Sequence, residues 1–467
     1  MNRPSKQDEQ KAAKGAEAPR RPMWPLAIFV FVVFYLAEPH SWRFSASDAM
    51  NLGNSDESIQ ERVQYNIAKN QAGSTKRRIG VGLLGGYGVF CLLARDGRKL
   101  RVRGAVGWVV LAFLAWVVAS LLWSIDPPVT LRKLLVFGLL CVAALGLVRR
   151  YSLEELAQLT LWVTGFMMAG GLLCEFGLGS FQPWRDGYRF SGLTWPAFTC
   201  WNASLFVIAG LTLTRVGRSW HRLAIAGVGT TLALLTKTRA GAAALVVAVL
   251  IHVSSTWSAA AKVLLVVGTS LALSLTLLVL SFSDVDVSRL LIRAVNLGRE
   301  ESAHGFSGRA GVWGMLLPYI LERPLQGYGY ESFWTERHLR EIGERNWGAP
   351  DAHNGYINLT LGVGIVGSGL YGVALLLAMF RSRNDFARSL HSHDLYPACV
   401  TFITAINALC VASQLSPHVM SFASIVVFAR LGFVQDDHPA AQERVALRRT
   451  TSTLCDGQPA EQVGRPL

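Results

Sequence analysis

The amino-acid sequence predicts an all-α fold, a polytopic transmembrane helix bundle of about 12 spans with a long, partly helical loop on the outer side of the membrane. Apolar residues make up 51% of the 467 residues and charged residues only 16%, a balance outside the range of soluble proteins. The apolar residues gather in runs, and a membrane-spanning helix needs about 20 such residues. None of the runs shows the alternation of an outer-membrane barrel. A helical membrane protein is therefore the prediction.

The apolar runs locate the predicted spans and divide the chain into five parts. The spans cover residues 23–38, 79–95, 105–123, 131–148, 157–178, 197–214, 221–237, 240–255, 262–282, 356–380, 395–415 and 418–433. The parts are a polar cytoplasmic N-terminus at 1–22, a transmembrane part of about nine spans at 23–282, a loop at 283–355, a C-terminal transmembrane part of about three spans at 356–433, and a polar cytoplasmic tail at 434–467 that is expected to be disordered.

Clusters of Lys and Arg set the expected orientation of the bundle. They fall in alternate connections, at residues 95–103, 149–150, 215–222, 381–388 and 448–449. Because basic connections stay on the cytoplasmic side, both termini are predicted to be cytoplasmic and the loop at 283–355 to face outward. Lys76, Arg77 and Arg78 disagree with this rule, since they would lie on the outer side, and the topology of the first hairpin stays open.

The composition also excludes several kinds of partner and cofactor. A net charge of +14 could suggest a nucleic-acid-binding protein, but the basic residues flank apolar runs and form no basic face interleaved with aromatic rings. We therefore expect no nucleic acid among the partners. The seven cysteines lie mostly in apolar stretches, and no pair has the spacing of a zinc or redox motif. Neither a metal site nor a cofactor is predicted.

The loop at 283–355 is too long to be a plain connection, since most connections are short and long ones are usually functional or disordered. Its aromatic content argues for packing, either of the loop against itself or against the outer face of the bilayer, rather than disorder. The aromatic residues concerned are Trp313, Tyr319, Tyr328, Tyr330, Phe333, Trp334 and Trp347. Within the loop, residues 316–321 predict a short apolar helix and residues 336–347 a polar surface helix.

Three motifs supply residues that could carry chemistry. Arg309 follows Gly308, His353 stands in Ala-His-Asn-Gly-Tyr, and Arg239 lies at the start of a predicted span on the same outer side. Arginine suits bidentate contact with phosphate, and histidine can transfer a proton near neutral pH. Two arginines and one histidine at the outer face therefore suit a phosphorylated lipid. The plain alternative is a solvated cation at Arg309 and a helix-entry residue at His353.

Neighbouring residues complete the predicted site. Trp313, Tyr328 and Asn354 are predicted to contact the substrate together with the two arginines. Asp351, two residues before His353, could raise the basicity of the imidazole, although a helix cap is the favoured role for it. His304 is a rival to His353 as the proton-transferring residue.

The sequence resembles a known family, the bacterial O-antigen ligase and polysaccharide polymerase superfamily, and in particular its exopolysaccharide-polymerase-like members. The resemblance covers most of the chain and is strongest over residues 308–367, where Gly-Arg, Trp, Arg-Pro-Leu-x-Gly-Tyr-Gly, Ala-His-Asn-Gly-Tyr and Gly-Ile-Val-Gly occur in the family's order. Weaker matches are Ser-Leu-Leu-Trp-Ser at 120–124 and Thr-Arg-Ala-Gly at 238–241. The segment 189–202 matches only loosely, so Asn202 receives no role.

The resemblance implies a glycosyltransferase of the bacterial inner membrane whose active site faces the periplasm. Members of this family take glycan from an undecaprenyl-pyrophosphate-linked donor, need no metal and invert the anomeric centre. On this basis Arg239 and Arg309 would hold the donor pyrophosphate, and His353 would activate the acceptor hydroxyl. The implied partners are this donor, a glycan or lipid acceptor, the bilayer, and other polysaccharide assembly and export proteins.

Several alternatives remain open at this point. Polymerisation of a lipid-linked repeat unit is favoured, and the alternative within the family is a ligase that moves a finished glycan onto lipid A core. A transporter should leave ionisable residues near the middle of its spans, whereas Glu175 and His252 lie near span ends. A non-catalytic assembly subunit would have no need of Arg239, Arg309 and His353 together.

Overall fold

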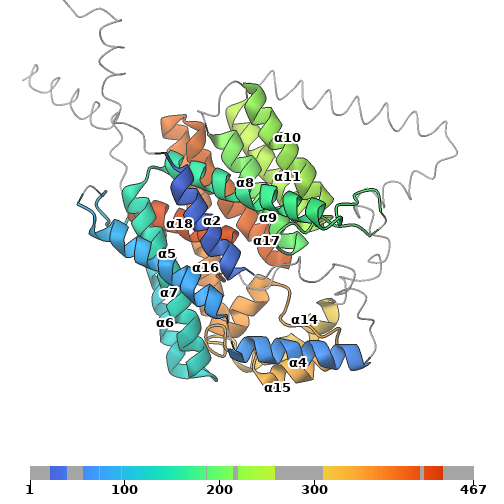
Figure 1. Ribbon diagram of the computed structural model, residues 1–467. Helices are drawn as coiled ribbons and strands as arrows, with labels where there is room; N and C mark the ends of the chain where they lie inside the picture. Colours follow the sequence, from blue (N-terminus) through green and yellow to red (C-terminus); the bar gives the residue numbers. More distant parts are fainter. Residues whose placement is uncertain are drawn as a thin grey trace, which may run out of the picture.

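The computed structural model describes residues 22–38, 56–72, 74–95, 97–185, 187–213, 219–257, 309–410 and 415–434 (Figure 1). Within these ranges all regular elements are helices, and one isolated bridge joins Leu100 to Val434. The helices are α2 (Trp24–Ala37), α4 (Asp56–Ala72), α5 (Thr75–Leu93), α6 (Gly104–Ala119), η1 (Ser120–Trp123), α7 (Pro127–Arg150), α8 (Leu153–Gly177), α9 (Pro196–Thr212), α10 (Ser219–Leu235), α11 (Arg239–Thr256), α14 (Arg309–Glu322), α15 (Glu336–Glu344), α16 (Gly355–Ser389), η2 (Ser392–Leu395), α17 (Tyr396–Asn407), η3 (Ala408–Cys410) and α18 (Val419–Phe433). The predicted all-α fold class is confirmed.

Five helical segments are long and apolar enough to cross a membrane, counting only the described residues. They are α6 continued by η1, then α7, α8, α11 and α16, while α2, α9 and α18 are shorter apolar helices. Each predicted span that falls within the described ranges overlaps a helix. The predicted span at 262–282 lies outside the described residues, so the total of about 12 spans stays a prediction.

Two adjacent helices, α5 and α7, define the ends of the bundle. Near the end of α7, Arg149 donates hydrogen bonds to the carbonyl oxygens of Leu92 (2.6 Å) and Ala94 (3.0 Å), where α5 ends. The two helices therefore begin at the same end of the bundle, and Arg77, at the start of α5, lies at that end with the start of α7. We call this the α7-start end.

Small residues allow the helices to pack closely. A Cβ atom added at Gly88 of α5 would meet the backbone of Ala143 in α7, and one added at Gly146 would meet the backbone of Gly88. Close backbone approach at small residues is the usual way in which membrane helices associate. Large apolar side chains remain on the outside of the bundle, as lipid contact requires, among them Leu122 (86% exposed) and Leu173 (73% exposed).

Helix α16 is interrupted one third of the way along, which the predicted span at 356–380 did not anticipate. Gly364 has a φ of 68°, and a Cβ there would collide with the carbonyl of Leu325. The segment before α15 fills the break, because Tyr328 N–H donates to Leu361 O (2.8 Å) and Ile365 N–H donates to Pro324 O (2.8 Å). The Arg-Pro-Leu-x-Gly-Tyr-Gly motif is thus fixed to α16 through its backbone.

The region 309–354 packs as an ordered unit on the first part of α16. Its apolar cluster includes Val312, Leu316, Phe333 and Ile342, and the rings of Tyr319 and Phe333 meet edge to face at 5.3 Å. The predicted self-packing of the aromatic residues is therefore confirmed for this part of the loop. The predicted helix bounds were too short at 316–321, because α14 already begins at Arg309, and too long at 336–347, because α15 ends at Glu344.

One helix near the site was not predicted at all. The polar helix α4 lies against α15 near the α7-start end of the bundle (Figure 1). Its apolar side chains Ile59, Val63 and Ile67 form a small cluster with Leu339 of α15 and Trp334. A search for long apolar runs misses such a helix, because its only sequence signal is an apolar residue at every fourth position.

Candidate active site

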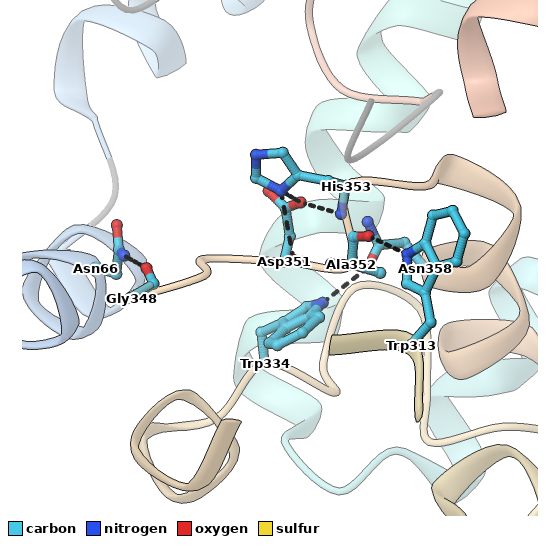
Figure 2. Close-up of polar contacts among 8 residues, drawn as sticks. All are labelled: Asn66, Trp313, Trp334, Gly348, Asp351, Ala352, His353 and Asn358. Atoms are coloured by element: carbon cyan, nitrogen blue, oxygen red, sulfur yellow. Dashed lines mark hydrogen bonds and ion pairs between the residues drawn. The ribbon is translucent and has the colours of Figure 1, made fainter. Parts of the chain in front are cut away.

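The centre of the candidate site is a tight turn from Asp351 to His353. The Asp351 carboxylate accepts a hydrogen bond from the backbone N–H of His353 (2.7 Å) and lies 2.7 Å from the imidazole Nδ1. Figure 2 shows Nδ1 facing the carboxylate and the other ring nitrogen pointing away from it. His353 has a φ of 46°, a left-handed backbone that the two contacts with Asp351 hold in place. The side chain is 30% exposed, so part of the ring can be reached from outside.

The electrostatic environment of His353 favours a stronger base. Partial burial lowers the pKa of His353. The charge and the hydrogen bond of Asp351 together raise that pKa by more than burial lowers it, so the pKa lies above the ordinary value. The positive charge of Arg309 acts in the opposite direction and lowers the pKa of His353. The two residues therefore interact electrostatically, and the proposed joint role of Arg309 and His353 stays a prediction.

Two tryptophans hold the turn from outside it. Trp313 Nε1 donates to the carbonyl oxygen of Ala352 (2.8 Å), and Trp334 Nε1 donates to Asn358 Oδ1 (3.0 Å). The same amide oxygen of Asn358 accepts from the N–H of Ala352 (3.2 Å), so both backbone polar groups of Ala352 are engaged (Figure 2). Ala352 itself is fully buried. The turn is therefore held by side chains from three separate segments.

Asn354 begins α16 as its N-cap. Its Oδ1 accepts hydrogen bonds from the N–H groups of Tyr356 (3.0 Å) and Ile357 (3.2 Å). The favoured prediction for Asp351, a helix cap, was therefore wrong, because Asn354 occupies the cap and Asp351 bonds His353 instead. The alternative role for Asp351, raising the basicity of the imidazole, agrees with the geometry.

Arg309 is the first residue of α14, and Trp313 stands one helical turn later. Residues four apart lie on the same face of a helix. Because Trp313 bonds the carbonyl of Ala352, the same face of α14 turns Arg309 toward the turn that contains His353. Two sequence motifs that are about 40 residues apart are brought together in this way.

Arg239, the first residue of α11, is positioned by helix packing. A Cβ added at Gly241 would collide with Cys200 of α9 and would lie 3.5 Å from Asn407 Oδ1 at the end of α17. At that same end of α17, the carbonyl of Ala405 accepts from Tyr356 Oη of α16 (2.9 Å). The beginnings of α11 and α16 therefore both lie at the end of α17, which puts Arg239 and His353 at the same end of the bundle.

Tyr328 is buried in the packed region after α14. It is only 4% exposed, and its hydroxyl is within 3.0 Å of both Tyr319 O and Glu322 Oε2. Gly329, the next residue, has a φ of 100°, and a Cβ there would meet Ser124 at 2.6 Å. Direct contact with substrate stays a prediction for Tyr328, Trp313 and Asn354, because the hydrogen bonds of all three side chains are made to other residues of the protein.

Several residues that support the Asp351–His353 turn were not predicted to do so. Asn358 and the α4 residues that contact the loop carry no motif of their own, and Trp334 was predicted only as a packing residue. The one available signal for Asn358 was its spacing of one helical turn from Asn354. The rival residue His304 lies outside the described residues.

The chain is similar in sequence to a known protein family. A family model described as O-antigen ligase matches residues 224–372, a range that includes Arg239, Arg309 and His353. A solved structure titled "Structural coordination of polymerization and crosslinking by a peptidoglycan synthase complex" contains a chain with 16% identity and a TM-score of 0.36, over 71% of this chain and 96% of that one. No curated protein matches the sequence.

Proposed function

The chain is a membrane protein that belongs to the O-antigen ligase and polymerase superfamily, and from this premise we propose that it is a periplasm-facing glycosyltransferase of surface or exopolysaccharide biosynthesis. Its donor is a glycan linked to undecaprenyl pyrophosphate, and its acceptor is a second glycan or a lipid. The observation that carries the proposal is the Asp351–His353 pair at 2.7 Å, in a turn whose Ala352 carbonyl is bonded by Trp313 from the helix that begins at Arg309.

His353 is the general base in this mechanism. The outer nitrogen, Nε2, takes the proton of the acceptor hydroxyl as that oxygen attacks the anomeric carbon of the donor sugar. Asp351 keeps the proton of the neutral imidazole on Nδ1, so that Nε2 presents its lone pair. Asp351 also stabilises the imidazolium formed when the proton is transferred.

Arg309 and Arg239 bind the pyrophosphate. As the new glycosidic bond forms, the bond between the anomeric carbon and the pyrophosphate oxygen breaks, and the leaving group takes the electron pair. Fixed guanidinium groups stabilise this developing negative charge more than they stabilise the ground state. Two arginines therefore supply the charge that a metal ion would otherwise supply, and attack opposite the leaving group inverts the anomeric centre.

The charge distribution supports an outward-facing site in the inner membrane. The last turns of α7 and α16 carry basic residues, Arg149 and Arg150 in α7 and Arg388 in α16. Basic helix ends stay in the cytoplasm. Since both helices begin near the candidate site, these ends support a site that faces the periplasm and chain termini that face the cytoplasm. Lys76, Arg77 and Arg78 at the start of α5 go against this orientation, because they lie at the same end as the site. The bilayer and proteins of polysaccharide assembly and export are the expected neighbours.

Polymerisation of a repeat unit is the reaction we favour, and ligation of a finished glycan onto lipid A core is the alternative. Glycan products from a strain that lacks the gene separate the two. A lost polymerase leaves single repeat units on the lipid carrier, whereas a lost ligase leaves long unattached chains. Complementation with an Arg309→Ala/His353→Ala double variant tests the enzyme itself. Restored glycan assembly by that variant would contradict the mechanism.

A further inference from the structure

Helix α4 contacts the segment that leads into the Asp351–His353 turn. Arg62 Nη1 donates to the carbonyl oxygen of Trp347 (3.2 Å), and Asn66 Nδ2 donates to the carbonyl oxygen of Gly348 (3.2 Å). Arg62 and Asn66 are four residues apart and therefore share a face of α4. Figure 2 shows the Asn66–Gly348 contact beside the turn that carries His353.

The segment that α4 holds also touches the catalytic ring. The indole of Trp347 meets the imidazole of His353 edge to face, with ring centres 4.9 Å apart and planes at 90°. Gly348, with a φ of 78°, packs so closely on α4 that an added Cβ would lie 2.9 Å from Arg62 Cβ. A shift of α4 would therefore move Trp347, whose indole ring packs against the imidazole of His353.

A third contact links α4 to the other support of the turn. Asn70 Nδ2 donates to the carbonyl oxygen of Trp334 (2.6 Å), whose indole N–H bonds the Asn358 amide that holds Ala352. The backbone carbonyl of Asn70 in turn accepts from Arg132 Nη2 of α7 (2.7 Å). Helix α4 is thereby attached to the membrane bundle at one end.

We propose that α4 is a positioning helix for catalysis, with Arg62 and Asn66 as positioning residues that hold the 347–353 segment and so keep His353 aligned with the acceptor hydroxyl. This inference rests on the proposed function of His353. Arg62 and Asn66 are not proposed to touch the reacting atoms. A catalytic group that must lie within about half an ångström of its productive position needs such external support.

The test is an isosteric change at Asn66 with a matched control. Asn66→Asp keeps the shape of the side chain but removes the donor to Gly348 O, while Gln60→Glu makes the same amide-to-acid change at an exposed position of α4. Initial rates of glycan transfer from a lipid-pyrophosphate glycan donor are measured for both purified variants. We expect kcat of Asn66→Asp to fall on the order of ten-fold with little change in the KM for donor, and Gln60→Glu to behave as wild type.

A second pair of variants tests the other contact. Arg62→Ala should lower kcat in the same way, and Arg62→Lys should recover part of the loss because an ammonium group can still donate to the Trp347 carbonyl. A role in folding alone would lower the amount of active enzyme, which active-site titration detects, without this rescue. Equal kcat values for Asn66→Asp and Gln60→Glu would overturn the proposal.

Hydrogen exchange separates this proposal from the proposed function. Backbone exchange across residues 345–354 should become severalfold faster in Asn66→Asp than in Gln60→Glu, whether or not the protein transfers glycan. Unchanged exchange would overturn the role of α4 while leaving the proposed function intact. Faster exchange in a protein whose wild-type form transfers no glycan would instead refute the catalytic part of the proposal.

Discussion

Arg239 and His353, two candidate groups at the same end of the bundle, are positioned by different physical means. Arg239 stands at the start of an apolar helix, and the close approach of Gly241 to Cys200 fixes that helix against α9. His353 stands in a strained turn. The turn is fixed by a hydrogen bond that Trp313 donates to it and by hydrogen bonds that the Asp351 carboxylate and the Asn358 amide oxygen accept from its backbone. Steric packing thus positions the arginine, and directional polar contacts position the histidine.

This difference predicts which changes will matter where. A helix in a bundle is held by many small contacts, so the loss of one side chain moves it little. A turn held by a few hydrogen bonds loses its geometry when one of them is lost, because each bond is directional. Substitutions of the residues that support these two groups should therefore alter proton transfer by His353 more than phosphate binding by Arg239.

Apart from the loss of His353 itself, the largest expected effects are those of the arginines. Arg309→Ala and Arg239→Ala should each lower kcat/KM by about 10²–10³-fold, because each removes a fixed charge from the leaving group. They should differ in pH dependence. Loss of the Arg309 charge raises the pKa of His353, so the acidic limb of the rate profile moves to higher pH in Arg309→Ala. A similar shift in Arg239→Ala would contradict the view that Arg239 binds phosphate without influencing the pKa of His353.

Asp351→Asn should move the same limb in the opposite direction. Removing the carboxylate charge lowers the pKa of His353, so the neutral base persists to lower pH, and the limb shifts toward acid. The plateau rate should fall on the order of ten-fold, because the imidazolium formed by proton transfer loses its counter-charge. Rate measurements between pH 5 and pH 9 check the prediction, and an unshifted limb would refute the coupling of Asp351 to His353.

Helix packing at Arg239 is tested by Gly241→Ala. The added Cβ collides with Cys200, so the protein should lose about 1–3 kcal/mol of stability through overpacking. Gly227→Ala is the control, since no heavy atom lies within 4 Å of a Cβ added there. Thermal unfolding in detergent compares the two. Equal midpoints would show that α11 is not held at this contact, whereas the pH profile of Gly241→Ala should stay that of wild type.

The smallest expected effect is that of Trp313→Phe. The change keeps an aromatic ring but removes the N–H that bonds Ala352 O, a loss of about 1 kcal/mol. We expect a few-fold fall in kcat, with an unchanged amount of folded protein. Trp108→Phe serves as the control because Trp108 is 65% exposed on the outside of α6. An equal fall in kcat in both variants would remove the hydrogen bond as the cause.

The sequence was sufficient to predict those features that depend on local pattern. Apolar runs located the helices of the bundle, and the motif residue Trp313 does bond the turn that contains His353. Features that depend on contacts between distant segments were missed. The break in α16 at Gly364 exists because residues 324–328 bond its exposed backbone, and nothing near Gly364 in the sequence encodes that partner.

The role of Asp351 illustrates the same limit. Its position two residues before His353 is compatible both with capping a helix and with bonding an imidazole. Only the actual start of α16, at Gly355 behind the Asn354 cap, decides between them. Helix α4 was missed for a related reason, because its function in the fold comes from what it touches and not from its own composition.

Purified protein reconstituted with a lipid-pyrophosphate-linked glycan, in the presence of a chelator, tests the central claim most directly. We predict that the wild-type protein transfers glycan under these conditions and that His353→Ala, at equal protein and with donor binding retained, is slower by about 10²–10⁴-fold. Transfer by His353→Ala at the wild-type rate would contradict the role of His353 as the general base.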